Sequence, residues 1–324
     1  MFIILLAHTP ANPWTKWIPA RFGFSDATES FVFCSGMASA IAFGAVFDRA
    51  GWILGTVRTA HRVWQVYWAH IGMFAIIAMS MVWLNSFEGL ERDYINQLNL
   101  HPFFNEPERN LFGLMTLTYV PNYFDILPMY LVILAMMPLV MALARIHPAV
   151  ALGALVALWM ATSVGRFADE GWDGLAPLAE TVSFLHLPAQ YWFDPPGNER
   201  SWFFNPYAWQ LVLFTGFAFM RRRIPAPPVN RWLILAALAI VVVFFFASHI
   251  SLRRYDWQDA VFWSDWRSAV IGWRVENREF ITKTDFGILR YVHFLAVAYL
   301  AWVAVGPRGA RRHIGVWWPR IVGV

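Results

Sequence analysis

The chain has 324 residues, of which 58% are hydrophobic and only 14% are charged. Soluble domains are about 45–50% apolar and about 25% charged, so this composition excludes an ordinary soluble protein and indicates a membrane protein. The net charge of +4 is small. The sequence has no basic stretch interleaved with aromatic residues of the kind that predicts binding to nucleic acid. The single cysteine, Cys34, excludes a framework of disulfides.

Apolar stretches of near-bilayer length recur along the chain, and each predicts a transmembrane helix because about 20 apolar residues span the hydrocarbon core. A shorter apolar run, 1–7, opens the sequence, and a further run begins at Ile314 and reaches Val324. We therefore expect an all-α polytopic bundle of about 8–10 spans, in one domain over residues 1–324, truncated at both ends. The complete runs are 31–47, 63–84, 123–144, 148–165, 202–220, 232–250 and 289–305.

Basic residues gather in alternate connections between these runs. Because Lys and Arg are retained on the cytoplasmic side of short loops, this alternation predicts the orientation of the bundle. The connections expected in the cytoplasm are 48–62, 145–147, 221–231 and 306–313. The connections expected outside hold nearly all the acidic residues, and they are 9–30, 85–122, 166–201 and 251–287.

An ionisable residue, His8, directly follows the first apolar run, and two acidic residues lie close behind it. Asp26 and Glu29 are three residues apart, a spacing that places both carboxylates on one face of a helix. One interpretation is that this segment caps the second span and presents a hydrated acidic face. The other is that one carboxylate orients the imidazole of His8, which needs a partner to hold one tautomer.

A second polar segment begins with Arg58 and Arg62, which lie about one helical turn apart. Two guanidinium groups at this spacing suit a phosphate or carboxylate ligand, although Arg at a cytoplasmic helix end also satisfies the orientation rule. Tyr67 and His70 follow deeper in the predicted span. Polar side chains at membrane depth predict a polar bundle interior or a water-filled cavity.

Arg290 and His293 lie one helical turn apart at the start of the last complete span. Arg290 suits either a surface anchor or a ligand-binding group, whereas an imidazole in this position favours a functional role. The outer connections are rich in aromatic residues beside acids, a combination that suits sugar binding as well as an interfacial belt. The residues expected to bind such an acceptor are Trp192, Asp194, Trp257 and Trp263.

Several of these segments resemble one family in the same order along the chain. His8-Thr9-Pro10, followed at 23–36 by Gly-Phe-Ser-Asp-Ala-Thr-Glu-Ser-Phe-Val-Phe-Cys-Ser-Gly, resembles the start of the OpgC proteins. These proteins are membrane succinyltransferases for osmoregulated periplasmic glucans, related to the membrane acyltransferase-3 superfamily. The later segments similar to that family are 62–70, 125–128, 205–210 and 289–294.

This resemblance implies an O-acyltransferase of the bacterial inner membrane that moves a succinyl or similar group from a cytoplasmic acyl-CoA to periplasmic glucan hydroxyls. His8 would act as general base, oriented by Asp26 or Glu29, as implied by the first-span histidine of the superfamily. We expect no cofactor or metal, with acyl-CoA as co-substrate. The residues expected to bind the acyl donor are Arg58, Arg62, Tyr67, His70, Arg290 and His293.

Two other classes of function stay open. A multispan transporter of an anionic or glycan-related substrate also needs polar residues at membrane depth and spans interrupted by proline. A membrane scaffold that binds periplasmic glycan would use the outer aromatic residues, but it leaves Arg58, Tyr67 and His70 without a role. Nucleotide bound at the cytoplasmic face would distinguish the enzyme from both.

Overall fold

The described part of the chain is helical. Within it no β-strand occurs, and two isolated bridges pair Tyr119 with Gln190 and Pro188 with Ser201. The expected all-α membrane fold is confirmed. The computed structural model describes residues 2–9, 12–87, 92–169, 172–190, 200–248 and 261–306. Of the helices in these ranges, four are long and apolar enough to cross a membrane: Ala27–Asn85, Ile126–Ile146, Pro148–Ala168 and Ile288–Val305.

The chain divides into two compact units that each draw on segments distant in sequence. Unit 1 comprises Met1–Phe31, Pro225–Ile281 and Ile288–Val324. Unit 2 comprises Val32–Ile224 and Thr282–Gly287. The expectation of one transmembrane domain over residues 1–324 stays a prediction.

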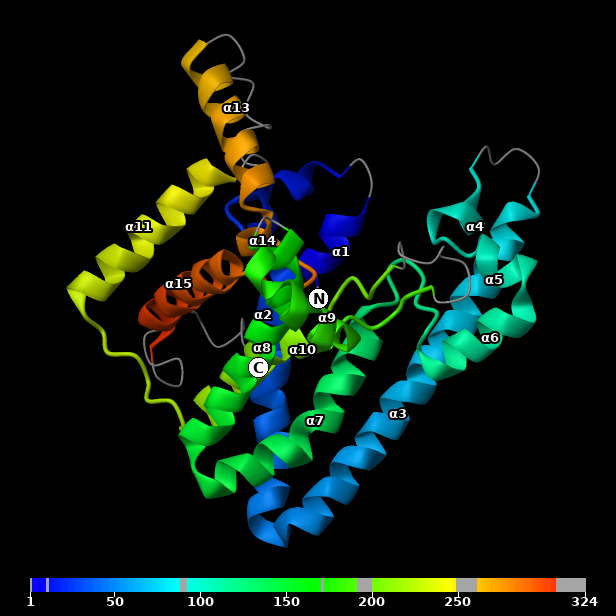
Figure 1. The fold of residues 1–324 in the computed structure, drawn as a ribbon, viewed down its shortest axis with the longest axis horizontal. Helices are drawn as coiled ribbons and strands as arrows, with labels where there is room; N and C mark the ends of the chain where they lie inside the picture. Colours follow the sequence, from blue (N-terminus) through cyan, green and yellow to red (C-terminus); the bar gives the residue numbers. More distant parts are fainter. Residues whose placement is uncertain are drawn as a thin grey trace, which may run out of the picture. The chain divides into compact units, whose positions relative to one another are not determined.

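Unit 1 contains two apolar helices, α11 (Arg231–Ala247) and α15 (Ile288–Val305), that pack against each other (Figure 1). The segment before α11 is tied to α15 through proline carbonyl groups, since the Tyr299 hydroxyl donates to Pro228 at 2.8 Å and the Trp302 indole to Pro227 at 3.2 Å. The other elements of unit 1 are α1 (Phe2–His8), η1 (Pro13–Trp17), η2 (Pro19–Arg21), the first turn of α2 (Ala27–Ser39), α13 (Val261–Glu276) and α14 (Arg278–Ile281).

Unit 2 begins with a long helical hairpin. Helix α2 continues through a π-helical turn, η3 (Ala40–Gly44), into α3 (Ala45–Asn85). The helix breaks at Gly51, whose φ of 82° and ψ of 177° only glycine adopts without strain. Figure 1 shows α2 and α3 as the two arms of the hairpin. The expected loop at 48–62 is therefore wrong: one glycine reverses the chain, and residues 52–62 continue the helix.

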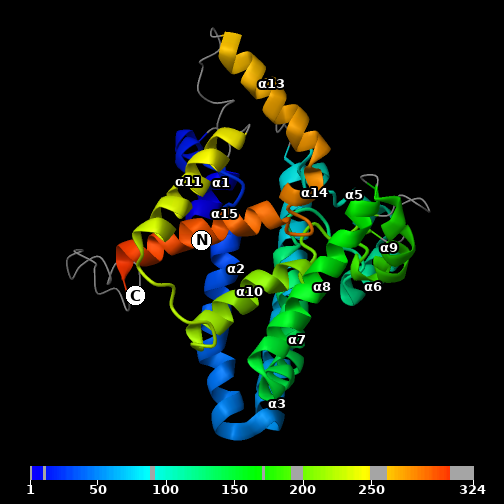
Figure 2. The same ribbon diagram turned by 60° about the vertical axis from the view of Figure 1, so that its left-hand side comes forward.

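Helix α10 (Pro206–Met220) forms the centre of unit 2, and most of its side chains are buried. A helix that is apolar on all sides suits such an interior position. It crosses α2 (Figure 2), and the crossing is so close that a Cβ at Gly36 would collide with the Leu213 carbonyl and a Cβ at Gly216 with the Phe33 carbonyl. Small residues permit this approach between membrane helices. Helices α7 (Ile126–Ile146) and α8 (Pro148–Asp169) also pack against α10.

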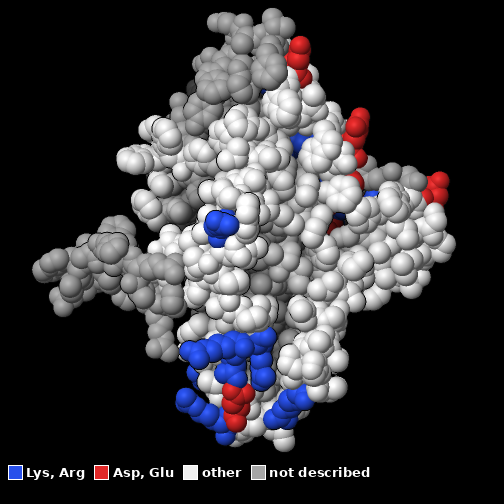
Figure 3. Space-filling view, turned by 90° about the vertical axis from the view of Figure 1, so that its left-hand side faces the viewer, with Lys and Arg blue, Asp and Glu red and all other residues white. Residues whose placement is uncertain are grey.

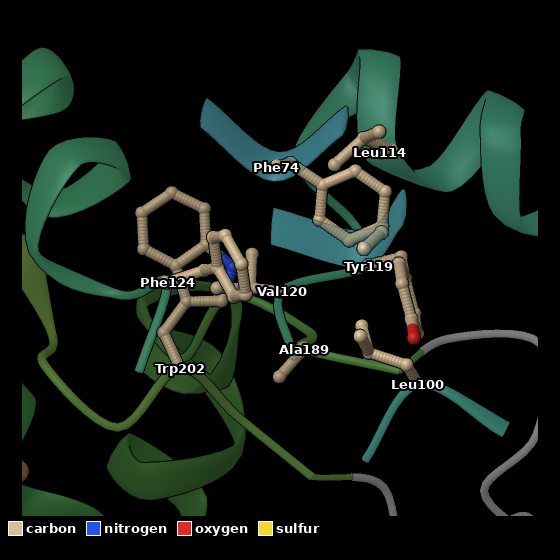
Figure 4. Close-up of a cluster of buried hydrophobic side chains, with 9 residues drawn as sticks. Phe74, Leu100, Leu114, Tyr119, Val120, Phe124, Ala189 and Trp202 are labelled. Atoms are coloured by element: carbon tan, nitrogen blue, oxygen red, sulfur yellow. The ribbon is translucent and has the colours of Figure 1, made fainter. Parts of the chain in front are cut away.

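An aromatic core holds the long connections of unit 2 against α3 (Figure 4). Phe74 of α3 packs edge to face on Phe124, with ring centroids 5.3 Å apart. The indole of Trp202 donates to the carbonyl groups of Leu117 and Pro188, both at 3.1 Å. The remaining elements are α4 (Tyr94–Gln97), α5 (His101–Asn105), α6 (Pro107–Thr116), η4 (Asp173–Leu175), α9 (Ala176–Val182) and η5 (Ser183–Leu185).

Basic side chains gather at one end of unit 2, around an acidic one (Figure 3). There Asp48 forms an ion pair with Arg221, and Arg49, Arg222 and Arg223 are exposed. This charge pattern agrees with the positive-inside rule. The assignment of this end to the cytoplasm stays a prediction.

Candidate functional site

The start of α2 is stabilised by a reciprocal pair of hydrogen bonds. The Thr28 backbone N–H donates to Asp26 Oδ1, and the Asp26 backbone N–H donates to Glu29 Oε2, both at 2.7 Å. This capping box satisfies two N–H groups that the first turn of a helix leaves without partners. The expected helix cap is thus confirmed, and it also holds both carboxylates in place. The hydrated acidic face expected with it is wrong, because Glu29 is fully buried.

The same carboxylates hold a buried guanidinium group. Glu29 has no exposed surface, and its Oε1 accepts from Arg290 Nε at 2.9 Å and from Arg290 Nη2. Asp26 Oδ2 lies 3.5 Å from the same Nη2. Arg290 is 8% exposed, so it forms a buried ion pair and is not a surface anchor. Charge-assisted bonds of this kind fix the guanidinium plane.

His293, one turn after Arg290, is held in a defined orientation. Its Nδ1 accepts from the Ser25 backbone N–H at 3.2 Å and lies 2.6 Å from Ser25 Oγ. A backbone N–H only donates, so a neutral ring here carries its hydrogen on Nε2. The ring stacks on Phe244, and a Cβ at Gly23 would collide with it. Among the described residues, the buried Nε2 has no hydrogen-bond partner.

Arg274 of α13 is a further basic residue of unit 1 that the sequence did not single out. Its guanidinium lies over the ring of Phe24, 5.2 Å from the centroid. Burial and the positive charge of Arg290 lower the pKa of Arg274. Its Nη1 is buried and makes no hydrogen bond within the described ranges. Arg274 and His293 therefore each offer an unused donor, which is suited to an anionic or carbonyl oxygen.

His8 is exposed at the end of α1, a helix with no buried residue. Its role as general base stays a prediction. Both oxygens of Glu29 bind the α2 cap and Arg290, and Asp26 Oδ1 binds the cap. That either carboxylate orients the His8 imidazole also stays a prediction.

The expected donor-binding residues of unit 2 all lie on α3 but differ in exposure. Arg58 and Arg62 are exposed, and Arg62 Nη1 donates to Gln65 at 3.3 Å. The Tyr67 hydroxyl donates to the Met115 carbonyl at 2.8 Å, so it stabilises the fold in this state. His70 is fully buried, and both its ring nitrogens lack hydrogen-bond partners in the described part of the chain. Phosphate binding by the two arginines stays a prediction.

The expected acceptor-binding residues are not tested by the structure. Trp192, Asp194 and Trp257 lie outside the described residues. Trp263 belongs to α13, but its side chain also lies outside the described part. No group of three or more His, Cys, Asp or Glu side chains among the described residues could hold a metal ion.

A polar network in unit 2 centres on Asp285, which has no exposed surface. Its Oδ1 accepts from Asn205 Nδ2 at 3.0 Å and faces His186 Nε2 at 3.3 Å, and its Oδ2 accepts from Arg166 Nε. Burial acts to raise the pKa of Asp285, but the His186 hydrogen bond and the Arg166 charge outweigh it, and the pKa is lowered.

Two tryptophan side chains hold the segment that carries Asp285. Trp159 of α8 donates to the Phe286 carbonyl, and Trp209 of α10 donates to the Lys283 carbonyl, both at 2.9 Å. Trp159 and Arg166 are seven residues apart, two turns along one face of α8. This spacing and the family-like segment 205–210, which carries Asn205, are sequence signals for parts of the network. Neither signal indicates that these residues meet at Asp285.

Comparison with known proteins assigns the chain to a family. A family model described as OpgC protein matches residues 1–322. The chain belongs to the OpgC family. The resemblance of the sequence segments is thereby confirmed, and membership indicates a membrane transferase with glucan-related acyltransferase activity. No curated protein and no solved structure matches the chain.

Proposed function

We propose that this protein transfers a succinyl or similar acyl group from a cytoplasmic CoA thioester to hydroxyl groups of a periplasmic glucan, in the bacterial inner membrane. Membership of the OpgC family carries this proposal. The buried polar residues at the start of α2 and α15 support it, because ionisable groups in membrane helices are costly and mark functional sites.

In the proposed reaction, His8 removes the proton from a glucan hydroxyl while that oxygen attacks the thioester carbonyl carbon. The tetrahedral intermediate collapses with cleavage of the carbon–sulfur bond. The CoA sulfur leaves as a thiolate and takes the proton back from the His8 imidazolium. General-base catalysis of this kind contributes about 10²–10⁴ in rate.

The developing oxyanion needs hydrogen-bond donors that are already in place. His293 Nε2 fits this task for two reasons. The hydrogen bond from the Ser25 backbone N–H to Nδ1 places the ring hydrogen on Nε2, and Nε2 has no hydrogen-bond partner among the described residues. Arg290 supplies positive charge, and the Glu29 carboxylate keeps its guanidinium in one orientation. Arg274 Nη1 is a second unused donor for the acyl group or its carboxylate.

The CoA phosphates are proposed to bind Arg58 and Arg62 on α3, where both side chains are exposed. Tyr67 and His70 extend this donor site along the same helix. The glucan is proposed to bind the outer aromatic and acidic residues, Trp192, Asp194, Trp257 and Trp263. Aromatic rings stack on the apolar faces of sugars, while carboxylates accept hydrogen bonds from hydroxyl groups.

The purified protein, reconstituted in lipid vesicles, tests this function with succinyl-CoA labelled in its acyl group and a soluble glucose polymer. We expect labelled ester on the polymer from the wild type and a loss of about 10² or more in rate for His8→Ala. His147→Ala is the matched control, because His147 is exposed at the end of α7. A wild type that forms no ester refutes the transferase, and a fully active His8→Ala refutes the base.

A further inference from the structure

Arg166 and His186 share one buried carboxylate and still present unused atoms to solvent. Arg166 binds Asp285 through Nε, and its Nη atoms have no hydrogen-bond partner among the described residues. His186 faces Asp285 with its Nε2 atom, so its other ring nitrogen, Nδ1, points away from this carboxylate. Their side chains are 27% and 25% exposed, whereas Asp285 is fully buried. The carboxylate therefore orients two groups that a ligand can reach.

The hydrogen bonds define what each group can bind. His186 Nε2 lies 3.3 Å from Asp285 Oδ1, and a carboxylate favours the tautomer that carries its hydrogen on the facing nitrogen, so Nδ1 of a neutral His186 ring is an acceptor. The two Nη atoms of Arg166 form a planar pair of donors that matches a carboxylate. An oxyanion beside a hydroxyl group would satisfy both side chains at once.

Two exposed aromatic rings lie close in sequence to His186 and Asn205. Phe184 lies two residues before His186 and is 71% exposed, and Phe203, two residues before Asn205, is 49% exposed. The Lys283 ammonium lies 6.0 Å from the centroid of the Phe203 ring. Apolar rings beside cationic and hydroxyl-accepting groups suit a sugar that carries a negative charge.

We propose that Arg166 and His186, held by Asp285, form a binding site for a carboxylated saccharide. The proposal rests on the proposed function, since a glucan that has received a succinyl group carries a free carboxylate close to sugar hydroxyls. The site lies in the connection 166–201, which the charge pattern predicts to face the periplasm. It binds the substituted glucan, and not the unmodified polymer, through Arg166.

Isothermal titration calorimetry in detergent solution tests this site without an acyl donor. The probes are a β-linked gluco-oligosaccharide with one succinyl ester, the methyl ester of that succinyl group, and the unsubstituted oligosaccharide. In the wild type, we expect the free carboxylate to lower the Kd at least tenfold relative to the neutral methyl ester. Equal Kd values for the two esters overturn the proposal without any substitution.

Arg166→Lys keeps the positive charge beside Asp285 but removes the planar pair of donors. We expect this variant to bind the succinylated probe at least tenfold more weakly and the unsubstituted probe unchanged. Arg109→Lys is the matched control, because Arg109 is an exposed arginine of unit 2 that pairs with Glu106 at 3.2 Å. Wild-type affinity of Arg166→Lys for the succinylated probe overturns the proposal.

The binding assay separates this site from the proposed catalysis. A wild type that forms ester from succinyl-CoA but does not distinguish the probes retains the transferase and loses the saccharide site. If the wild type forms no ester but distinguishes the probes, and Arg166→Lys abolishes that difference, the saccharide site stands and the transferase is refuted.

Discussion

Glu29→Gln is expected to destabilise the protein by about 3–5 kcal/mol, because it removes one partner of a buried ion pair. Glu29 has no exposed surface, and the Arg290 side chain is only 10% exposed. The carboxylate accepts from Arg290 at one oxygen and from the Asp26 backbone N–H at the other. A glutamine amide has one acceptor, so its NH₂ group must face a donor in either orientation. Each buried bond lost in this way costs about 1–3 kcal/mol.

The free energy of unfolding can be measured by titrating the protein with SDS in mixed micelles and following helical circular dichroism. Glu106→Gln is the matched control, since Glu106 pairs with Arg109 at 3.2 Å while their side chains are 45% and 62% exposed. This exposed pair should contribute about 0–1 kcal/mol. A loss for Glu29→Gln no larger than that of the control would show that the pair of Glu29 and Arg290 is not a buried charge pair.

Three further predictions concern helix packing, pH and the donor. Gly36→Ala should destabilise the protein by about 1–3 kcal/mol, because the added Cβ collides with α10. Gly72→Ala is the control, since a Cβ there has nothing within 4 Å, and it should change stability by less than about 1 kcal/mol. Equal effects of the two variants in the SDS titration contradict the close crossing of α2 and α10. Burial raises the pKa of Asp125 from 3.8 to about 6. Asp125 therefore contributes most to the free energy of unfolding below the unfolded pKa, and about 3 kcal/mol of that free energy is lost as pH rises from the unfolded pKa through about 6. Asp125→Asn should remove this part of the pH dependence of stability, and an unchanged pH dependence refutes the raised pKa of Asp125. Replacing Arg58 and Arg62 with Glu should raise KM for acyl-CoA far more than KM for glucan, and equal increases would argue against phosphate binding.

The sequence was sufficient for the class of fold and for local features. Apolar runs of bilayer length predicted the membrane helices, because a segment that spans the hydrocarbon core must pair its own backbone N–H and C=O groups, as a helix does. The cap at Asp26 and Glu29 was also predictable, since its two hydrogen bonds join residues within one helical turn. The chain reversal at Gly51 was predicted as part of the longer connection 48–62, because the sequence does not show that a single glycine adopts the positive φ that turns the chain.

The sequence alone determined that this chain is an all-α membrane protein of the OpgC type, because composition and residue spacing carry that information locally. Only the tertiary structure decided which polar groups meet. Arg290 binds Glu29 across 261 residues, and Asp285 binds Arg166 across 119 residues, and no local period encodes either separation. Such pairs exist because a buried charge must find a counter-charge wherever packing places one. The partner of a polar residue is therefore set by the burial of whole helices, which the sequence of one helix does not contain.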